Sequence, residues 1–261
     1  SQTTANLRGV WVSPNGQQAW IVGDSGTVLQ YQGPPEARSR SIVSLPDPYR
    51  GLAVLAVHGR TADNVWIAGQ GQMLLKYEAG SFVQKSPPIT SGTLRAVWVA
   101  GNDVLAAGDG GVLLHYNLPA AKLETAPSGT LKNLRAVWGT DADNYWFGGD
   151  EGTAIHQLGG SLRIARAAEV GYSNLNAGAV QADGRALIVS STGGLWTVDS
   201  DAKTFTPLSF SGTLEAIWGF EAQDLWAVGD HQILHYSPAG LTVTAQSQYL
   251  FSIWGSAAND I

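Results

Sequence analysis

The sequence predicts an all-β fold, a β-propeller of four-stranded antiparallel blades, on two observations. The pattern L-x-A-V-W-G recurs along the chain at intervals of 47, 40, 40, 41, 39 and 36 residues. A period of roughly 40 to 50 residues is that of a four-stranded propeller blade. Short β-rich runs also alternate with Gly, Asp and Asn turns, and no segment carries an apolar stripe of helical period. The copies begin at Leu7, Val54, Leu94, Leu134, Leu175, Leu214 and Leu250.

Each repeat contains four runs that we expect to form strands. The first ends in the Trp of the pattern, and the second reads WIVGD from Trp20 or WFGGD from Trp146. The third reads TVLQY at 27–31 or QILHY at 232–236, and a looser fourth run follows, such as LTVTA at 241–245. One blade of this size cannot bury its own apolar faces, so each blade must pack against its neighbours.

The repeat also predicts the domain organisation, a single propeller domain over residues 1–261. The last copy has its first Trp at Trp254, and the second would fall beyond Ile261. We therefore expect six complete repeats plus the start of a seventh, in a chain that is incomplete at its C-terminus. Seven blades are favoured, with six as the alternative. The expected blades are 7–50, 51–91, 92–131, 132–172, 173–211, 212–247 and a partial 248–261.

Composition excludes several classes of function. Only 14% of the residues are charged and the net charge is −6, which leaves no electrostatic footprint for nucleic acid. The chain has no cysteine, which excludes disulfides, thiolate nucleophiles and cysteine-bound zinc. No apolar run approaches the ~18 residues of a membrane-spanning helix. We expect no cofactor and no membrane span, and the oligomeric state stays open.

The run LEAIWGFEAQDLWAVGDHQILHY at 214–236 resembles the repeats of the photosystem II assembly factor family. Those are propellers of the bacterial-neuraminidase or Asp-box type, and similar repeats occur in surface and secreted proteins of soil bacteria. The resemblance covers essentially the whole chain and implies the propeller fold. The Asp-box turn S-x-D-x-G-x-x-W is replaced here by sequences such as YEAGSF at 77–82, and the sialidase catalytic residues find no match.

The repeated tryptophans are either a sugar-stacking surface or the filling between blades. Their strict periodicity favours the second interpretation. The fifth repeat has Ala179 and Leu187 at the two Trp positions but gains Trp196 on its third strand, which indicates volume compensation inside a core. The repeated residues are Trp11, Trp98, Trp138, Trp218 and Trp254 in the first strand and Trp20, Trp66, Trp146 and Trp226 in the second.

Histidines and aspartates also recur with the period. His115, His156 and His235 occupy similar third-strand positions on different blades, so we expect a repeated strand residue rather than a metal cluster. His58 replaces the first-strand Trp and is expected in the core. We expect the aspartates that follow the second-strand Gly to hydrogen-bond the backbone two residues on, as turn residues. They are Asp24, Asp109, Asp150 and Asp230.

The candidate ligand-binding residues are Arg8, Arg95 and Arg135, each at the second position of a first strand. This position varies between blades while its neighbours do not. A cationic arc there could hold a carboxylate or a phosphate through charge-assisted hydrogen bonds. The alternative is that the arginines simply pair with turn carboxylates.

These observations predict a non-enzymatic, extracytoplasmic bacterial scaffold that binds proteins or glycans through one face of the propeller, since no asymmetric catalytic constellation accompanies the repeat. One alternative is a carbohydrate-binding lectin with repeated sites between blades. A glycoside hydrolase or lyase, less favoured, would need two carboxylates ~5 to 9.5 Å apart in one pocket.

Overall fold

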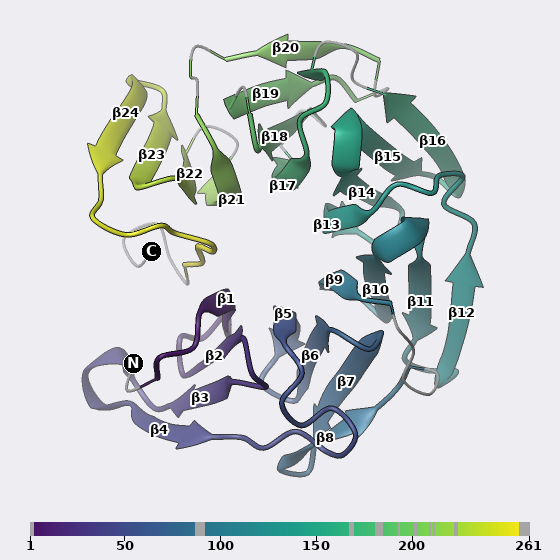
Figure 1. The fold of residues 1–261 in the computed structure, drawn as a ribbon, viewed down its shortest axis with the longest axis vertical. Coiled ribbons are helices and arrows are strands. Elements are labelled where there is room, and N and C mark those ends of the chain that lie inside the picture. The colour runs from purple at the N-terminus through teal and green to yellow at the C-terminus, as the bar shows by residue number, and fades with distance from the viewer. Residues whose placement is uncertain are drawn as a thin grey trace. The chain divides into compact units, whose positions relative to one another are not determined.

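The computed structural model describes residues 3–86, 92–166, 170–180, 185–192, 194–200, 203–208, 210, 212–221 and 224–255. These residues form six four-stranded antiparallel sheets in which each strand pairs with the next along the chain. The all-β prediction and the four-stranded propeller blade are confirmed. The chain divides into two compact units, Ser1–Ala126 and Pro127–Ile261, with three sheets in each (Figure 1).

The first unit contains three sheets and two single turns of 3₁₀ helix. Its first sheet is β1 (Leu7–Val12), β2 (Gln18–Gly23), β3 (Val28–Gln32) and β4 (Ser39–Ile42), with η1 (Pro35–Ala37) before β4. Its second sheet is β5 (Val54–Thr61), β6 (Asn64–Gly69), β7 (Met73–Glu78) and β8 (Ser81–Gln84). Its third sheet is β9 (Leu94–Ala100), β10 (Asp103–Gly108), β11 (Leu113–Asn117) and β12 (Lys122–Ala126), with η2 (Asp109–Gly111) before β11.

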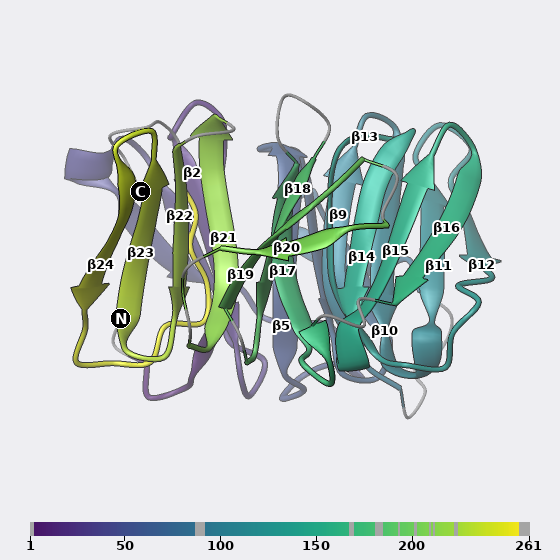
Figure 2. The same cartoon turned by 90° about the horizontal axis from the view of Figure 1, so that it is seen from above.

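The second unit repeats this arrangement, and Figure 2 shows the strands β13 to β16 of its first sheet lying side by side. That sheet is β13 (Leu134–Asp141), β14 (Asn144–Gly149), β15 (Thr153–Leu158) and β16 (Ser161–Arg166), with η3 (Asp150–Gly152) before β15. The next is β17 (Leu175–Val180), β18 (Ala186–Ser190), β19 (Gly194–Val198) and β20 (Phe205–Pro207). The last is β21 (Leu214–Glu221), β22 (Asp224–Gly229), β23 (Gln232–Ser237) and β24 (Gly240–Ala245).

The prediction of seven blades is wrong, because the described residues form six. Residues 248–255, from the partial seventh blade expected at 248–261, form no strand. A strand needs a neighbour to take its backbone hydrogen bonds, and no strand of the described residues pairs with this segment. The segment instead lies against the sixth sheet. The Leu250 N–H donates to Gly229 O at 3.2 Å, and the rings of Trp218 and Trp254 are 5.7 Å apart. Residues 256–261 lie outside the described chain.

The apolar core lies between consecutive sheets. In the first unit, Trp66 of the second sheet packs with Leu94 and Tyr116 of the third. In the second unit, Trp138 and Trp146 pack with Ile188 and Trp196 of the next sheet. Within each unit, neighbouring sheets thus bury apolar faces against one another, as blades too small to fold alone require.

The glycine that ends the second strand has a steric cause. A Cβ on Gly23 would lie 2.3 Å from Asn6 O, and one on Gly149 would lie 2.4 Å from Asn133 O. No side chain fits at such a distance, so glycine lets the end of the second strand approach the residue before the first strand. The following N–H then donates to the same oxygen, as Asp24 N–H does to Asn6 O at 2.9 Å. This contact carries the turn aspartate to the start of the first strand.

Candidate functional site

The candidate site consists of two repeated positions in each sheet. The hydrogen bond between the end of the second strand and the residue before the first strand brings them together. The first-strand position is the residue after the opening Leu or Val, and the turn position is the residue after the second strand. The first-strand residues are Arg8, Leu55, Arg95, Arg135, Asn176 and Glu215. The matching turn residues are Asp24, Gln70, Asp109, Asp150, Ser191 and Asp230.

All three candidate arginines form an ion pair with the turn aspartate of their own sheet. Arg8 binds Asp24 with two hydrogen bonds, from Nε to Oδ1 at 3.0 Å and from Nη2 to Oδ2 at 2.9 Å. The Asn6 side chain donates to the same carboxylate at 3.0 Å. The hydrogen bond from Arg8 is the largest cause that lowers the pKa of Asp24, while partial burial acts in the opposite direction.

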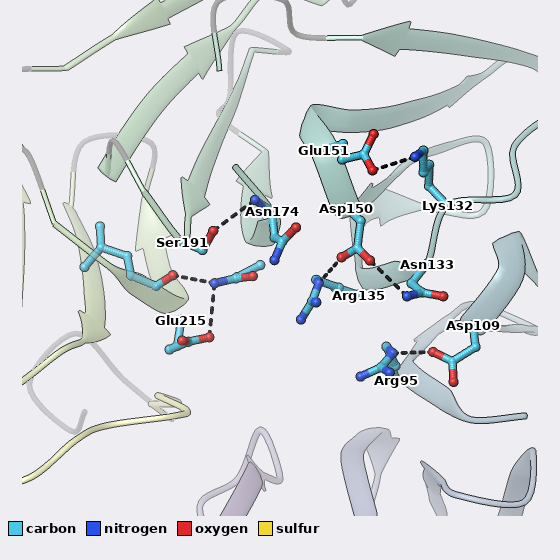
Figure 3. A network of polar contacts seen from close by, with 12 residues as sticks. Arg95, Asp109, Lys132, Asn133, Arg135, Asp150, Glu151, Asn174, Ser191 and Glu215 are labelled. Carbon is cyan, nitrogen blue, oxygen red and sulfur yellow. Dashed lines mark hydrogen bonds and ion pairs between the residues drawn. The ribbon is translucent and has the colours of Figure 1, made fainter. Parts of the chain in front are cut away.

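Arg95 and Arg135 bind their aspartates differently. Arg95 donates from Nε to Asp109 Oδ1 at 2.6 Å, and Arg135 donates from Nε to Asp150 Oδ1. Within the described chain, neither residue has an acceptor for its two Nη nitrogens. Figure 3 shows these nitrogens of Arg135 directed away from Asp150. About a third of each arginine side chain is exposed, so the outer edge of each guanidinium is open to an anion.

Three of the four turn aspartates therefore do not act as the sequence predicted. The side chains of Asp24, Asp109 and Asp150 accept hydrogen bonds from first-strand arginines. Asp24 and Asp150 also accept from the asparagines at positions 6 and 133, whereas Asp230 lies 3.7 Å from His231. The arginines pair with turn carboxylates, which was the alternative interpretation of the sequence. Whether Arg8, Arg95 and Arg135 also bind a ligand stays a prediction.

The arginines stand on separate sheets. Arg8 on β1 and Arg95 on β9 belong to the first unit, where β5 lies between these strands in chain order and carries Leu55 at the same position. Arg135 belongs to the second unit. Each arginine therefore has its own carboxylate partner, and each is a separate candidate position for binding an anion.

The last two sheets carry no arginine at this position. Asn176 Nδ2 donates to Leu214 O at 2.9 Å and to Glu215 Oε2 at 3.1 Å. The Tyr249 hydroxyl donates to Glu215 Oε1 at 2.5 Å. Partial burial and this hydrogen bond raise the pKa of Tyr249. The first-strand position thus changes from cationic at Arg135 to anionic at Glu215 within the second unit.

The tryptophans fill the structure between sheets, as their periodicity predicted. Trp11, Trp20, Trp66, Trp138 and Trp146 are buried, and Trp98, Trp218, Trp226 and Trp254 are half-buried. Trp138 and Trp146 are cross-strand partners with nearly parallel rings, whose centroids are 6.5 Å apart. The compensating Trp196 is buried in the same cluster. A buried indole offers no open face for a sugar ring, so glycan recognition gains no support from these residues.

The recurring histidines each bind the polar residue at the start of the second strand. His115 and His235 donate from Nε2 to Asp103 and Asp224, both at 2.6 Å. His156 contacts Asn144 at 2.9 Å and stacks on Trp146. No group of three or more potential metal ligands occurs in the part of the chain that the structure describes. Nor does any helix among these residues have the length and apolar character to cross a membrane.

Sequence reasoning missed the partners of these residues. Asn133 and the Lys132–Glu151 ion pair beside Arg135 were not singled out, nor was the contact of Tyr249 with Glu215. The sequence does contain one signal of the arginine–aspartate pairing. In the sheets whose turn residue is Gln70 or Ser191 rather than Asp, the first-strand residue is not arginine.

Comparisons with known proteins agree with this fold. No family model matches the chain. It is 28% identical over 114 residues to the photosystem II assembly lipoprotein Ycf48 of Synechocystis sp. strain PCC 6803, a match that covers 42% of this chain and 33% of that protein. The chain therefore matches about a third of the length of its curated relative.

Two solved structures show the same architecture. The WD40 repeats of RRP9 superpose with a TM-score of 0.79 at 8% identity, covering 97% of this chain and 84% of that one. A structure of YCF48 bound to a D1 peptide superposes with a TM-score of 0.69 at 15% identity, covering 94% of this chain and 83% of that one. At these identities the structures establish the fold alone. The chain is a β-propeller with similarity to the photosystem II assembly factor Ycf48.

Proposed function

We propose that this chain is a non-enzymatic scaffold that binds a protein segment through the arginines of its first-strand position. The propeller fold and the similarity to Ycf48 support a protein-binding or assembly scaffold. The observation that carries the proposal is the pairing of Arg95 and Arg135 through Nε alone, which leaves two Nη groups of each without an acceptor in the described chain.

The chemistry of that edge favours a carboxylate. Two parallel N–H groups of a guanidinium match the two oxygens of a carboxylate, and such charge-assisted pairs are about twice as strong as neutral hydrogen bonds. The paired aspartate holds each guanidinium in place, so little side-chain entropy is lost on binding. The solved YCF48 structure contains a D1 peptide, which supports a peptide as the kind of partner to test here.

The test is an array of immobilised 15-residue synthetic peptides in which the number of Asp and Glu residues is graded from zero to five. We expect the full chain to bind in proportion to acidic content and to lose binding between 50 and 500 mM salt. The triple variant Arg8→Gln, Arg95→Gln, Arg135→Gln should bind at background level. The control Arg50→Gln removes an arginine that is paired with Asp47 and largely exposed, and it should bind normally. Equal binding by the triple variant would overturn the proposal.

We place this scaffold outside the cytoplasm, and the description of the curated relative as a lipoprotein supports that location. Fractionation of cells that express the natural gene tests this location, and recovery in the cytoplasm alone would contradict it.

Glycan recognition by the surface of the propeller stays a prediction. Calorimetry with a panel of oligosaccharides checks it, and no heat of binding to any of them would exclude it for that panel.

A further inference from the structure

Two very exposed apolar side chains stand on segments of the second unit that contact the same turn. Leu131 is 89% exposed and Tyr172 is 88% exposed, the highest values among the large apolar residues of the described chain. Leu131 precedes β13, Tyr172 precedes β17, and the residue after each contacts the η3 turn at Asp150–Gly152. Single exposed apolar residues are ordinary on a protein surface, but these two stand on segments joined to the turn that holds the partner of Arg135.

Hydrogen bonds of the next residue in sequence connect each of these segments to the turn. Lys132, next to Leu131, donates from Nζ to Glu151 Oε1 at 2.5 Å (Figure 3). The Gly152 N–H donates to Ser173 O at 2.7 Å, and Ser173 follows Tyr172. The turn is therefore joined to both segments that carry Leu131 and Tyr172, which limits the entropy lost when a partner binds.

The same turn carries Asp150, which holds Arg135. Asn133 fixes the other oxygen of this carboxylate at 2.9 Å, so both oxygens of Asp150 are used. The Nη edge of Arg135 has no acceptor in the described chain, so it can donate to a partner. Tyr and Arg are also the residue types that most often dominate the binding energy of interfaces.

We propose that Leu131, Tyr172 and Arg135 form one docking surface for a peptide in which an acidic residue is flanked by apolar residues. The carboxylate binds the Nη edge of Arg135, and the apolar side chains cover Leu131 and the ring of Tyr172. The inference rests on the proposed function, because it uses Arg135 as the anion-binding residue, and it adds the apolar part of the recognition.

The test uses three fluorescein-labelled, terminally blocked peptides with Gly-Ser flanks and the full chain. Their cores are Leu-Glu-Leu-Asp-Phe, its charge-inverted form Leu-Lys-Leu-Lys-Phe, and its apolar-free form Ser-Glu-Ser-Asp-Ser. Fluorescence anisotropy should show binding of the first, none of the second, and at least tenfold weaker binding of the third. Tyr172→Ala should weaken binding of the first by about tenfold, as truncating a residue that dominates an interface does, and Leu131→Ala should weaken it by less.

Both substitutions lie at almost fully exposed side chains, so the fold should be kept. The control is Ile42→Ala, which removes an apolar side chain that is 72% exposed on β4, and it should leave binding unchanged. Equal binding of the first and third peptides, or wild-type binding by the double variant Tyr172→Ala, Leu131→Ala, would overturn the docking surface. If Arg135→Gln still abolished binding in that case, the proposed function would stand. Binding that Arg135→Gln leaves unchanged would instead remove the arginine from both proposals.

Discussion

The backbone N–H of Val99 donates a hydrogen bond of 3.0 Å to Nδ1 of His58, from strand β9 to the neighbouring strand β5. His58 occupies the position where other repeats have tryptophan, and its cross-strand partner is Trp66. Since Nδ1 accepts this bond, the imidazole must be neutral and carry its proton on Nε2. The side chain thus joins two sheets in a way that a protonated ring cannot.

We predict that His58 makes the first unit sensitive to acid. His58 is half-buried rather than fully in the core, and desolvation by the groups around it lowers its pKa from 6.5 to about 4. A lowered histidine pKa means that the unfolded chain binds the proton more tightly, so this stabilisation is complete above pH 6.5 and is lost as the pH falls to 4. The loss is on the order of 1 to 3 kcal/mol. Thermal unfolding at pH 7 and pH 4 measures it.

The matched variant for this prediction is His58→Phe, which keeps a ring but cannot titrate. It loses the acceptor for Val99 N–H at every pH, so its stability should be lower by a constant of about 1 kcal/mol. Its stability should fall less than that of the wild type between pH 7 and pH 4. Equal falls in the two proteins would mean that the charge change of His58 does not matter.

Two glycines of the first sheet should respond oppositely to alanine. A Cβ on Gly23 would lie 2.3 Å from Asn6 O, a backbone atom that cannot move aside. A Cβ on Gly9 would meet Cγ2 of Val22 at 3.1 Å, a contact that a small shift relieves, and other repeats have alanine there, such as Ala96 and Ala136. We expect Gly23→Ala to destabilise by about 1 to 3 kcal/mol and Gly9→Ala to be neutral or stabilising by up to about 1 kcal/mol. Urea unfolding of both variants measures the two changes in stability. Similar unfolding midpoints for the two variants would contradict the steric explanation.

Gly178 and Trp138 should be coupled across two sheets. A Cβ on Gly178 would lie 2.2 Å from Trp138 Cε2, so the glycine makes room for the indole. Gly178→Val, which restores the residue type of the other repeats, should therefore destabilise the second unit by more than 1 kcal/mol. In the background Trp138→Leu, which removes the ring, the same change should cost much less. A double-mutant cycle by urea unfolding measures the coupling, and additive effects would show that the two residues do not compete for space.

The repeat made most of the fold predictable. The strand runs, the turn residues and the interior tryptophans all follow from a sequence pattern that recurs in each blade. The pattern recurs because each blade must bury the same apolar faces. The number of blades did not follow. The run at 250–255 has the residues of a first strand, but a strand also requires a partner, and residue type alone does not supply one.

The site was predictable only in part. Variation at the position of Arg8, Arg95 and Arg135 identified it from the sequence. Their pairing with aspartates depends on the close approach of the end of the second strand to the start of the first. The sequence does not show this approach, in which Gly23 and Gly149 lie against carbonyl oxygens. Leu131 and Tyr172 could not be recognised, because an apolar residue in a loop does not reveal its exposure.

The pKa of Asp24 should report directly on Arg8. The two hydrogen bonds from Arg8 favour the ionised carboxylate and hold its pKa below 3.8, so their contribution to stability is present above that value and is lost as the pH falls through the lowered pKa. In Arg8→Gln the pKa of Asp24 should rise toward 3.8, while Arg50→Gln should leave it unchanged. Carbon-13 NMR titration of the side-chain carboxyl measures both. Because both partners are about a third exposed, the loss of stability at neutral pH should be only about 0.5 to 1 kcal/mol. An unchanged Asp24 pKa in Arg8→Gln would mean that the asparagine at position 6, rather than the arginine, stabilises the charge of this carboxylate.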